Sequence, residues 1–162
     1  MLEDGETKIG DSFAIAEHLE ATWPDRPALF APGESGRAVA RLVEGYANLT
    51  VGAALMPFIV KDIHDLLAPA DQTYFRTTRE KRLGRTLEEV QAGRENRTDE
   101  IRKALAPMRH MLRSAPFIGG ASPLYVDYIV AGHLIWATTV TAFPILDGEA
   151  EVTAWLARVR AA

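Results

Sequence analysis

Residues 124–141, LYVDYIVAGHLIWATTVT, are the segment that decides the fold. The segment is long enough for about five helical turns and is apolar nearly all round. A helix of this kind has to be covered on every side, so we expect it to be the buried centre of a helical domain.

Helical spacing of apolar residues recurs on both sides of this segment. It predicts one long helix that opens at a Thr86–Glu89 capping box, with irregularities at Gly93 and Pro107. Pro57 is expected to kink or end the helix that contains it. The other predicted helices cover residues 12–23, 35–55, 69–84 and 151–160.

The start of the chain is the exception to this helical pattern. Leu2–Asp4 and Thr7–Ile9 flank a good turn pair, Asp4-Gly5, and predict a short hairpin. A hairpin of two strands alone is only marginally stable in water, so we expect the first ten residues to be disordered or to self-associate. The predicted fold class is mainly α.

Composition narrows the function. The 162 residues are 48% hydrophobic and 25% charged, as in a soluble globular domain, and the net charge of −4 argues against nucleic acid as the main partner. The absence of cysteine excludes disulfides and thiolate chemistry within the chain. The four histidines lack metal-ligand spacing, so no metal is expected. We also expect no membrane-spanning segment, and a cytoplasmic location.

One local motif could bind a ligand. Asp11 and Ser12 stand at the start of a predicted helix. A serine there offers its hydroxyl, its N–H and the positive end of the helix dipole, which suit a carboxylate. An adjacent aspartate can bind an ammonium group. The alternative is that both residues only cap the helix.

Two parts of the chain resemble the glutathione S-transferase superfamily. Residues 4–20 and 23–30 resemble the end of its thioredoxin-like domain. Residues 87–97, with 117–120 and 125–127, resemble the helical domain of the bacterial β-etherase branch, whose members cleave aryl ethers in lignin-derived compounds. The resemblance implies a thioredoxin-like remnant over residues 1–30 and an all-helical C-terminal domain over 31–162.

The same resemblance implies a site. Ser12 would bind the γ-glutamyl carboxylate of glutathione, the co-substrate, and Asp11 would help to bind its amino group. A pocket for a hydrophobic aromatic co-substrate would be shaped by Tyr46, Asn48, Met56 and Phe58, although core packing is an equal alternative for each. A homodimer is also implied.

The departures from the family pattern concern catalysis. The Ser, Tyr or Cys that activates the glutathione thiol, and a cis-proline before a later strand, would lie before Met1, and no residue matches them. We therefore expect an N-terminally truncated chain that has no catalytic residue of its own and is inactive alone. The alternative is a non-catalytic helical interaction or assembly module.

The remaining candidates have structural interpretations. Asp127 is expected to be a structural carboxylate bonded to backbone N–H groups, with Ser122-Pro123 starting the helix. His64-Asp65 could be an acid–base pair but suits an exposed helix end better. Trp136 and Phe143 are expected in the core. The arginine-rich cluster could attract an anionic substrate, but a solvated face is favoured for its members Arg76, Arg79, Lys81, Arg82 and Arg85.

Overall fold

The computed structural model describes the whole chain, residues 1–162. The N-terminal hairpin is present as predicted. Strands β1 (Leu2–Asp4) and β2 (Thr7–Ile9) pair antiparallel, with Leu2 opposite Ile9. Gly5 makes the turn with a positive φ of 57°.

The hairpin is fixed to the helix that follows it. Helix α1 spans Ser12–Thr22, and the His18 Nε2 atom lies 2.8 Å from Asp4 Oδ2. The expectation of disorder in the first ten residues is therefore wrong, because a side-chain contact holds the hairpin onto α1. Self-association through the hairpin stays a prediction.

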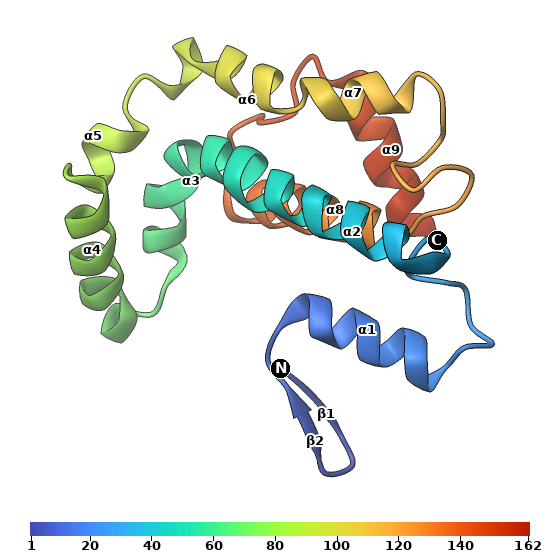
Figure 1. Cartoon of the computed structure of the whole chain (residues 1–162). Helices are drawn as coiled ribbons and strands as arrows, with labels where there is room; N and C mark the ends of the chain where they lie inside the picture. The colour runs from blue at the N-terminus through green and yellow to red at the C-terminus, as the bar shows by residue number, and fades with distance from the viewer.

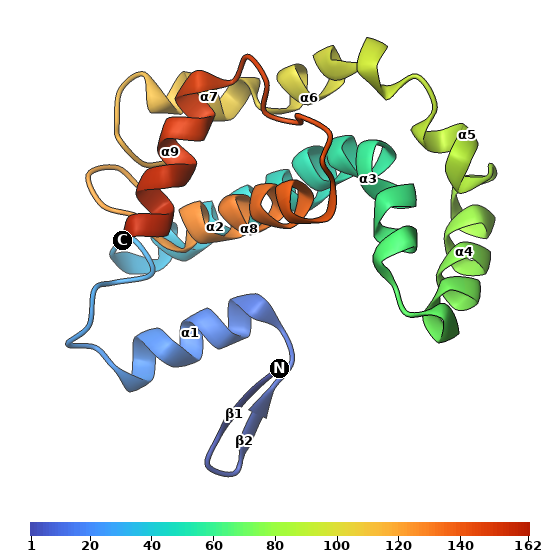
Figure 2. The same cartoon turned by 180° about the vertical axis from the view of Figure 1, so that it is seen from behind.

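The next three elements form one continuous helix of 34 residues. They are α2 (Gly33–Tyr46), the π-helical segment η1 (Ala47–Gly52) and α3 (Ala53–Leu66). Pro57 lies inside α3 and does not end the helix, although the chain bends within α3 in both views (Figures 1 and 2). The helix thus runs past the boundary that the sequence predicted near residue 55.

The chain from residue 69 to residue 112 is a series of shorter helices. Helix α4 ends at Gly84, whose φ is 70°. The single long helix predicted after Thr86 is broken, because Gly93 takes a left-handed conformation and Pro107 starts a new helix. The elements are α4 (Pro69–Leu83), α5 (Leu87–Gln91), the 3₁₀ helix η2 (Arg94–Asn96), α6 (Thr98–Ala104) and α7 (Ala106–Leu112).

Helix α8 (Tyr125–Val140) is the centre of the bundle, as the sequence predicted. It packs against α2, η1, α3 and α9 (Ala150–Ala161), and it runs beside α2 in both views (Figures 1 and 2). Trp155, Phe58 and Leu134 are among the largest fully buried side chains of the core.

The two aromatic residues expected in the core, Trp136 and Phe143, differ in burial. Trp136 is 36% exposed, so that prediction is wrong, because α8 leaves one face uncovered there. Phe143 is partly buried and packs against the edge of the core.

A smaller core joins α1 to the bundle. Its aromatic members are Phe13, Phe30 and Tyr125, with ring centroids 5.2–5.4 Å apart. The Arg41 guanidinium lies 3.5 Å from the centre of the Phe13 ring. Helix α1 is therefore held against α2 and α8, while the domain boundary after residue 30 remains a prediction.

The long helix also bears on the expectation that no segment can span a membrane. By length and composition alone, Gly33–Leu66 is long and apolar enough to do so. One side of this helix, including Val51, Leu55 and Ile59, belongs to the main core, whereas Leu42, Leu49 and Leu66 are exposed. The helix is therefore buried on one side only.

Candidate functional site

The N-terminus of α1 is exposed and presents the two residues predicted to bind a ligand. Asp11 is the N-cap, and its Oδ1 accepts a hydrogen bond of 2.8 Å from the Ala14 N–H. The capping interpretation of Asp11 is therefore confirmed, and its binding role stays a prediction. Ser12 is the first helical residue and is exposed to solvent.

One neighbour reaches Ser12 from the bundle. The Tyr125 hydroxyl donates a hydrogen bond of 3.4 Å to Ser12 Oγ. Burial raises the pKa of the Tyr125 phenol, so this hydroxyl stays protonated and remains a donor at neutral pH. The Ser12 N–H and the hydroxyl hydrogen of Ser12 make no hydrogen bond within the chain.

A cavity of about 420 Å³ lies between η1, α3, α4 and α8. Its size is within the range of small-molecule sites. It includes two of the predicted pocket residues, Asn48 and Met56. The lining consists of Asn48, Leu49, Gly52, Ala53, Met56, Pro57, Arg79, Arg82, Leu83, His133 and Trp136.

The π-helical segment shapes this cavity. Irregular turns of this kind occur often at functional sites, and η1 contributes Asn48, Leu49 and Gly52. A Cβ atom on Gly52 would lie 2.9 Å from the His133 ring. Only glycine at this position lets the His133 ring of α8 lie so close to η1.

His133 is a lining residue that the sequence did not single out. Its Nδ1 lies 2.9 Å from the Ile129 carbonyl oxygen, which can only accept, so Nδ1 carries the hydrogen. In the neutral ring Nε2 is then left as an acceptor. A possible signal in the sequence was the spacing of His133 and Trp136, three residues apart on one helix.

The other two predicted pocket residues lie elsewhere. The Tyr46 hydroxyl donates a 2.6 Å hydrogen bond to the Ala104 carbonyl, and burial raises the pKa of Tyr46 to about 12. Its ring lines a separate apolar cavity of about 250 Å³ with Leu42 and Met111. Phe58 is fully buried in the core and lines neither cavity. Of the two alternatives for Phe58, core packing is therefore the one that holds.

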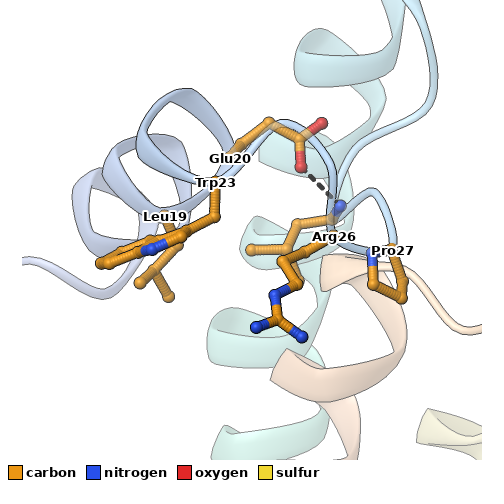
Figure 3. A pocket seen from close by; sticks show the side chains of 6 residues that line it. Leu19, Glu20, Trp23, Arg26 and Pro27 are labelled. Carbon is orange, nitrogen blue, oxygen red and sulfur yellow. Dashed lines mark hydrogen bonds between the residues drawn. The ribbon is translucent and has the colours of Figure 1, made fainter.

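A third hollow lies at the C-terminal end of α1 (Figure 3). Leu19, Trp23 and Arg26 line it, and the Glu20 carboxylate is already bonded to the Leu29 N–H at 2.6 Å. Eleven residues of helix separate this end from Ser12, or about 16 Å. The hollow is therefore distinct from the predicted ligand-binding end of α1.

Asp127 is a structural residue, as predicted. It is fully buried and accepts hydrogen bonds from the N–H groups of Ile118, Gly119 and Leu124 and from the indole N–H of Trp155. The expected Ser122-Pro123 start is wrong. The N-cap is Leu124, whose N–H is satisfied by Asp127 itself.

The charged candidates differ from one another. Arg76 is held by Glu80 and Glu88, whereas Arg79 and Arg82 line the 420 Å³ cavity. Arg82 is exposed, as the solvated-face interpretation expects, whereas Arg79 is partly buried.

The His64-Asp65 pair lies at the end of α3. Asp65 is exposed and also accepts a 2.6 Å hydrogen bond from Lys61, which with His64 lowers the pKa of its carboxyl group. This fits the exposed-helix-end interpretation.

Comparison with known proteins identifies the family. Residues 38–155 match the family model described as glutathione S-transferase, C-terminal domain. The chain belongs to the glutathione S-transferase family. The helical bundle preceded by a short hairpin is the fold that this membership implies.

Individual relatives support the same family assignment. A glutathione S-transferase-like protein, ustS, of Aspergillus flavus is 31% identical over 145 residues, covering 78% of this chain and 49% of that protein. The crystal structure of glutathione transferase GSTFuA3 from Phanerochaete chrysosporium matches 80% of this chain and 52% of that one, with 32% identity and a TM-score of 0.71. The fold of CsGST63524 from Ceriporiopsis subvermispora, solved in complex with glutathione, matches 90% and 61%, with 24% identity and a TM-score of 0.76. The chain thus spans between about half and three fifths of these relatives.

Proposed function

We propose that this protein binds glutathione at the N-terminus of α1 and directs its thiolate at an electrophilic aromatic substrate. The observation that carries the proposal is the exposed Ser12 at a helix N-terminus in a member of this family. Its N–H and hydroxyl would hold the γ-glutamyl carboxylate, aided by the helix dipole. Asp11 uses Oδ1 for the cap and would offer Oδ2 to the ammonium group.

The cavity beside η1 is the proposed pocket for the aromatic co-substrate, with Asn48 and Met56 in its lining. Tyr125, which touches Ser12, and His133, which lines the cavity, are eight residues apart on α8, or about 12 Å along its axis. The thiol is on the central residue of glutathione, so a molecule anchored at Ser12 would carry it only part of this distance. A co-substrate that extends from the cavity toward Ser12 would then meet the thiol, and proximity would favour attack.

The resemblance to the β-etherase branch suggests aryl ethers as substrates. The glutathione thiolate would attack the carbon that bears the ether oxygen, so that a C–S bond forms as the C–O bond breaks and the aryloxide leaves, to be protonated to a phenol by solvent. None of these 162 residues matches the group that would ionise the thiol. By themselves they would carry little activity, because the thiol would keep a pKa of about 8.5.

The proposal includes a cytoplasmic homodimer. Leu42 is 75% exposed and Met111 is 42% exposed, and both line the apolar cavity beside Tyr46. Exposed apolar patches of this kind mark interaction surfaces. Replacing Leu42 with lysine should convert a dimer into monomers in analytical ultracentrifugation, and an unchanged mass would remove this surface from the interface.

Calorimetric titration with glutathione tests the binding role. Ser12→Ala should weaken binding about tenfold, because one charge-assisted hydrogen bond is lost. Ser35→Ala is the matched control, since Ser35 is also exposed in the first turn of a helix. Equal affinities of the wild type and Ser12→Ala would contradict the proposal.

The second candidate is a non-catalytic helical interaction or assembly module. The match to the family model covers the helical domain alone, and the apolar surface around Leu42 favours this alternative. No binding of glutathione by the wild type, together with a stable assembly that Leu42→Lys disrupts, would support the module.

A further inference from the structure

The cavity beside η1 has an unusual balance of charge. The chain as a whole carries a net charge of −4, yet the lining of this cavity includes two arginines and no aspartate or glutamate. The excess of positive charge is therefore local.

The two arginines are not held by the fold. Arg76, one turn earlier on α4, is paired with both Glu80 and Glu88. The side chains of Arg79 and Arg82 form no ion pair and donate no hydrogen bond within the chain, although the Arg79 guanidinium lies over the Phe75 ring, 4.9 Å from its centre. Residues three apart on a helix share a face, so both guanidinium groups can act on one ligand.

The rest of the lining suits a flat apolar body. Trp136 contributes a ring that is 36% exposed, and Met56 and Leu83 add partly buried apolar surface. An aromatic ring against tryptophan and a carboxylate against arginine are both favourable contacts. A ligand that combines these two groups would use both parts of the cavity.

We propose that this cavity selects aromatic acids, with the ring against Trp136 and Met56 and the carboxylate between Arg79 and Arg82. The binding of an aromatic acid here does not depend on the proposed function. Only the assignment of this ligand as the co-substrate rests on it. The two arginines would thus determine specificity for an anionic aromatic compound over its neutral counterpart.

The test uses a matched pair of probes, naphthalene-2-carboxylate and the uncharged naphthalene-2-carboxamide, titrated by calorimetry at pH 7 without glutathione. The acid should bind the wild type about tenfold more tightly than the amide, the effect of a partly exposed charge-assisted contact. The double variant Arg79→Gln/Arg82→Gln should bind the acid no better than the amide and leave amide binding unchanged.

Two further variants control for net charge and for location. Lys81→Gln removes one positive charge from the same helix but from a residue outside the cavity, so the tenfold preference should remain. Ala53→Leu adds bulk at an exposed position in the cavity lining and should weaken the binding of both probes.

Several outcomes would overturn the inference. These are equal binding of the two probes by the wild type, a preference that survives in the double glutamine variant, and probe binding that Ala53→Leu leaves intact. Glutathione binding that depends on Ser12, without any preference for the acid, would retain the proposed function and reject this inference. A preference for the acid in a chain that does not bind glutathione would do the reverse.

Discussion

The N-termini of α8 and α1 are in contact, yet their polar groups have opposite surroundings. At α8, the buried Asp127 carboxylate accepts four hydrogen bonds, three from backbone N–H groups and one from Trp155. At α1, Asp11 accepts one backbone N–H, and Ser12 is exposed beside the Tyr125 hydroxyl. The donors around Asp127 are used by the fold, whereas the N–H and the hydroxyl hydrogen of Ser12 itself make no bond within the chain.

The same contrast separates the residues predicted to shape a pocket. Tyr46 is bound to a backbone carbonyl. Asn48 makes no side-chain hydrogen bond within the chain and lines the cavity with the unpaired Arg79. Polar groups that are hydrogen-bonded within the chain therefore contribute to stability, and exposed polar groups without a partner are the candidates for binding.

The largest expected effect is at the α8 end. Asp127→Ala should lower the free energy of unfolding by about 4 kcal/mol or more, because it leaves several buried donors without acceptors. Urea unfolding followed by circular dichroism measures it. The matched control is Asp71→Ala on the surface of α4, which removes an exposed carboxylate and should change stability little. A loss below about 1 kcal/mol in Asp127→Ala would contradict the structural role.

A smaller effect is expected at Tyr46. Tyr46→Phe should cost about 1 kcal/mol through the lost hydrogen bond to Ala104. Burial raises the pKa of Tyr46 from 10.0 to about 12, so the unfolded chain loses this proton first as the pH rises. The contribution to stability is thus present below pH 10 and is lost between pH 10 and about 12.

Unfolding of the wild type and of Tyr46→Phe at pH 8 and pH 11 checks that sign. Stability should fall less steeply with pH in the variant than in the wild type. Tyr74→Phe is the control, since Tyr74 is 74% exposed and should behave like the wild type. Equal slopes in all three proteins would show that the Tyr46 hydroxyl does not titrate as described.

The smallest stability effects are expected at the α1 end. Asp11→Ala should cost about 1 kcal/mol, because it removes a side-chain N-cap. Ser12→Ala should change stability by less than about 0.5 kcal/mol, because its hydroxyl is exposed. Thermal unfolding compares them. A greater loss in Ser12→Ala than in Asp11→Ala would mean that Ser12 is structural.

Much of the fold follows from the sequence where local signals and burial agree. The hairpin follows from Asp4-Gly5, and α8 follows from an apolar segment that only a core can cover. The role of Asp127 follows because a carboxylate in such a segment needs donors. The break at Gly93 was anticipated only as an irregularity, because periodicity reports the buried face and not the direction in which the chain leaves a turn.

The site was harder to predict than the fold. Asn48 and Met56 share a cavity, whereas Tyr46 and Phe58 do not, because residues two apart on a helix do not share a face. No local signal in the sequence distinguishes the π-helical turn η1, which contributes Asn48, from ordinary helix. His133, Arg79 and Arg82 join the cavity from α8 and α4, and only the tertiary fold brings these helices to η1.

Amide-resolved NMR during a glutathione titration tests the difference between the two helix ends most directly. The backbone N–H signals of Ser12 and Phe13 should shift in a saturable way, while those of Ile118 and Gly119, already bonded to Asp127, should stay in place. Saturable binding that leaves the Ser12 signal unmoved, or no binding, would contradict glutathione recognition at the N-terminus of α1.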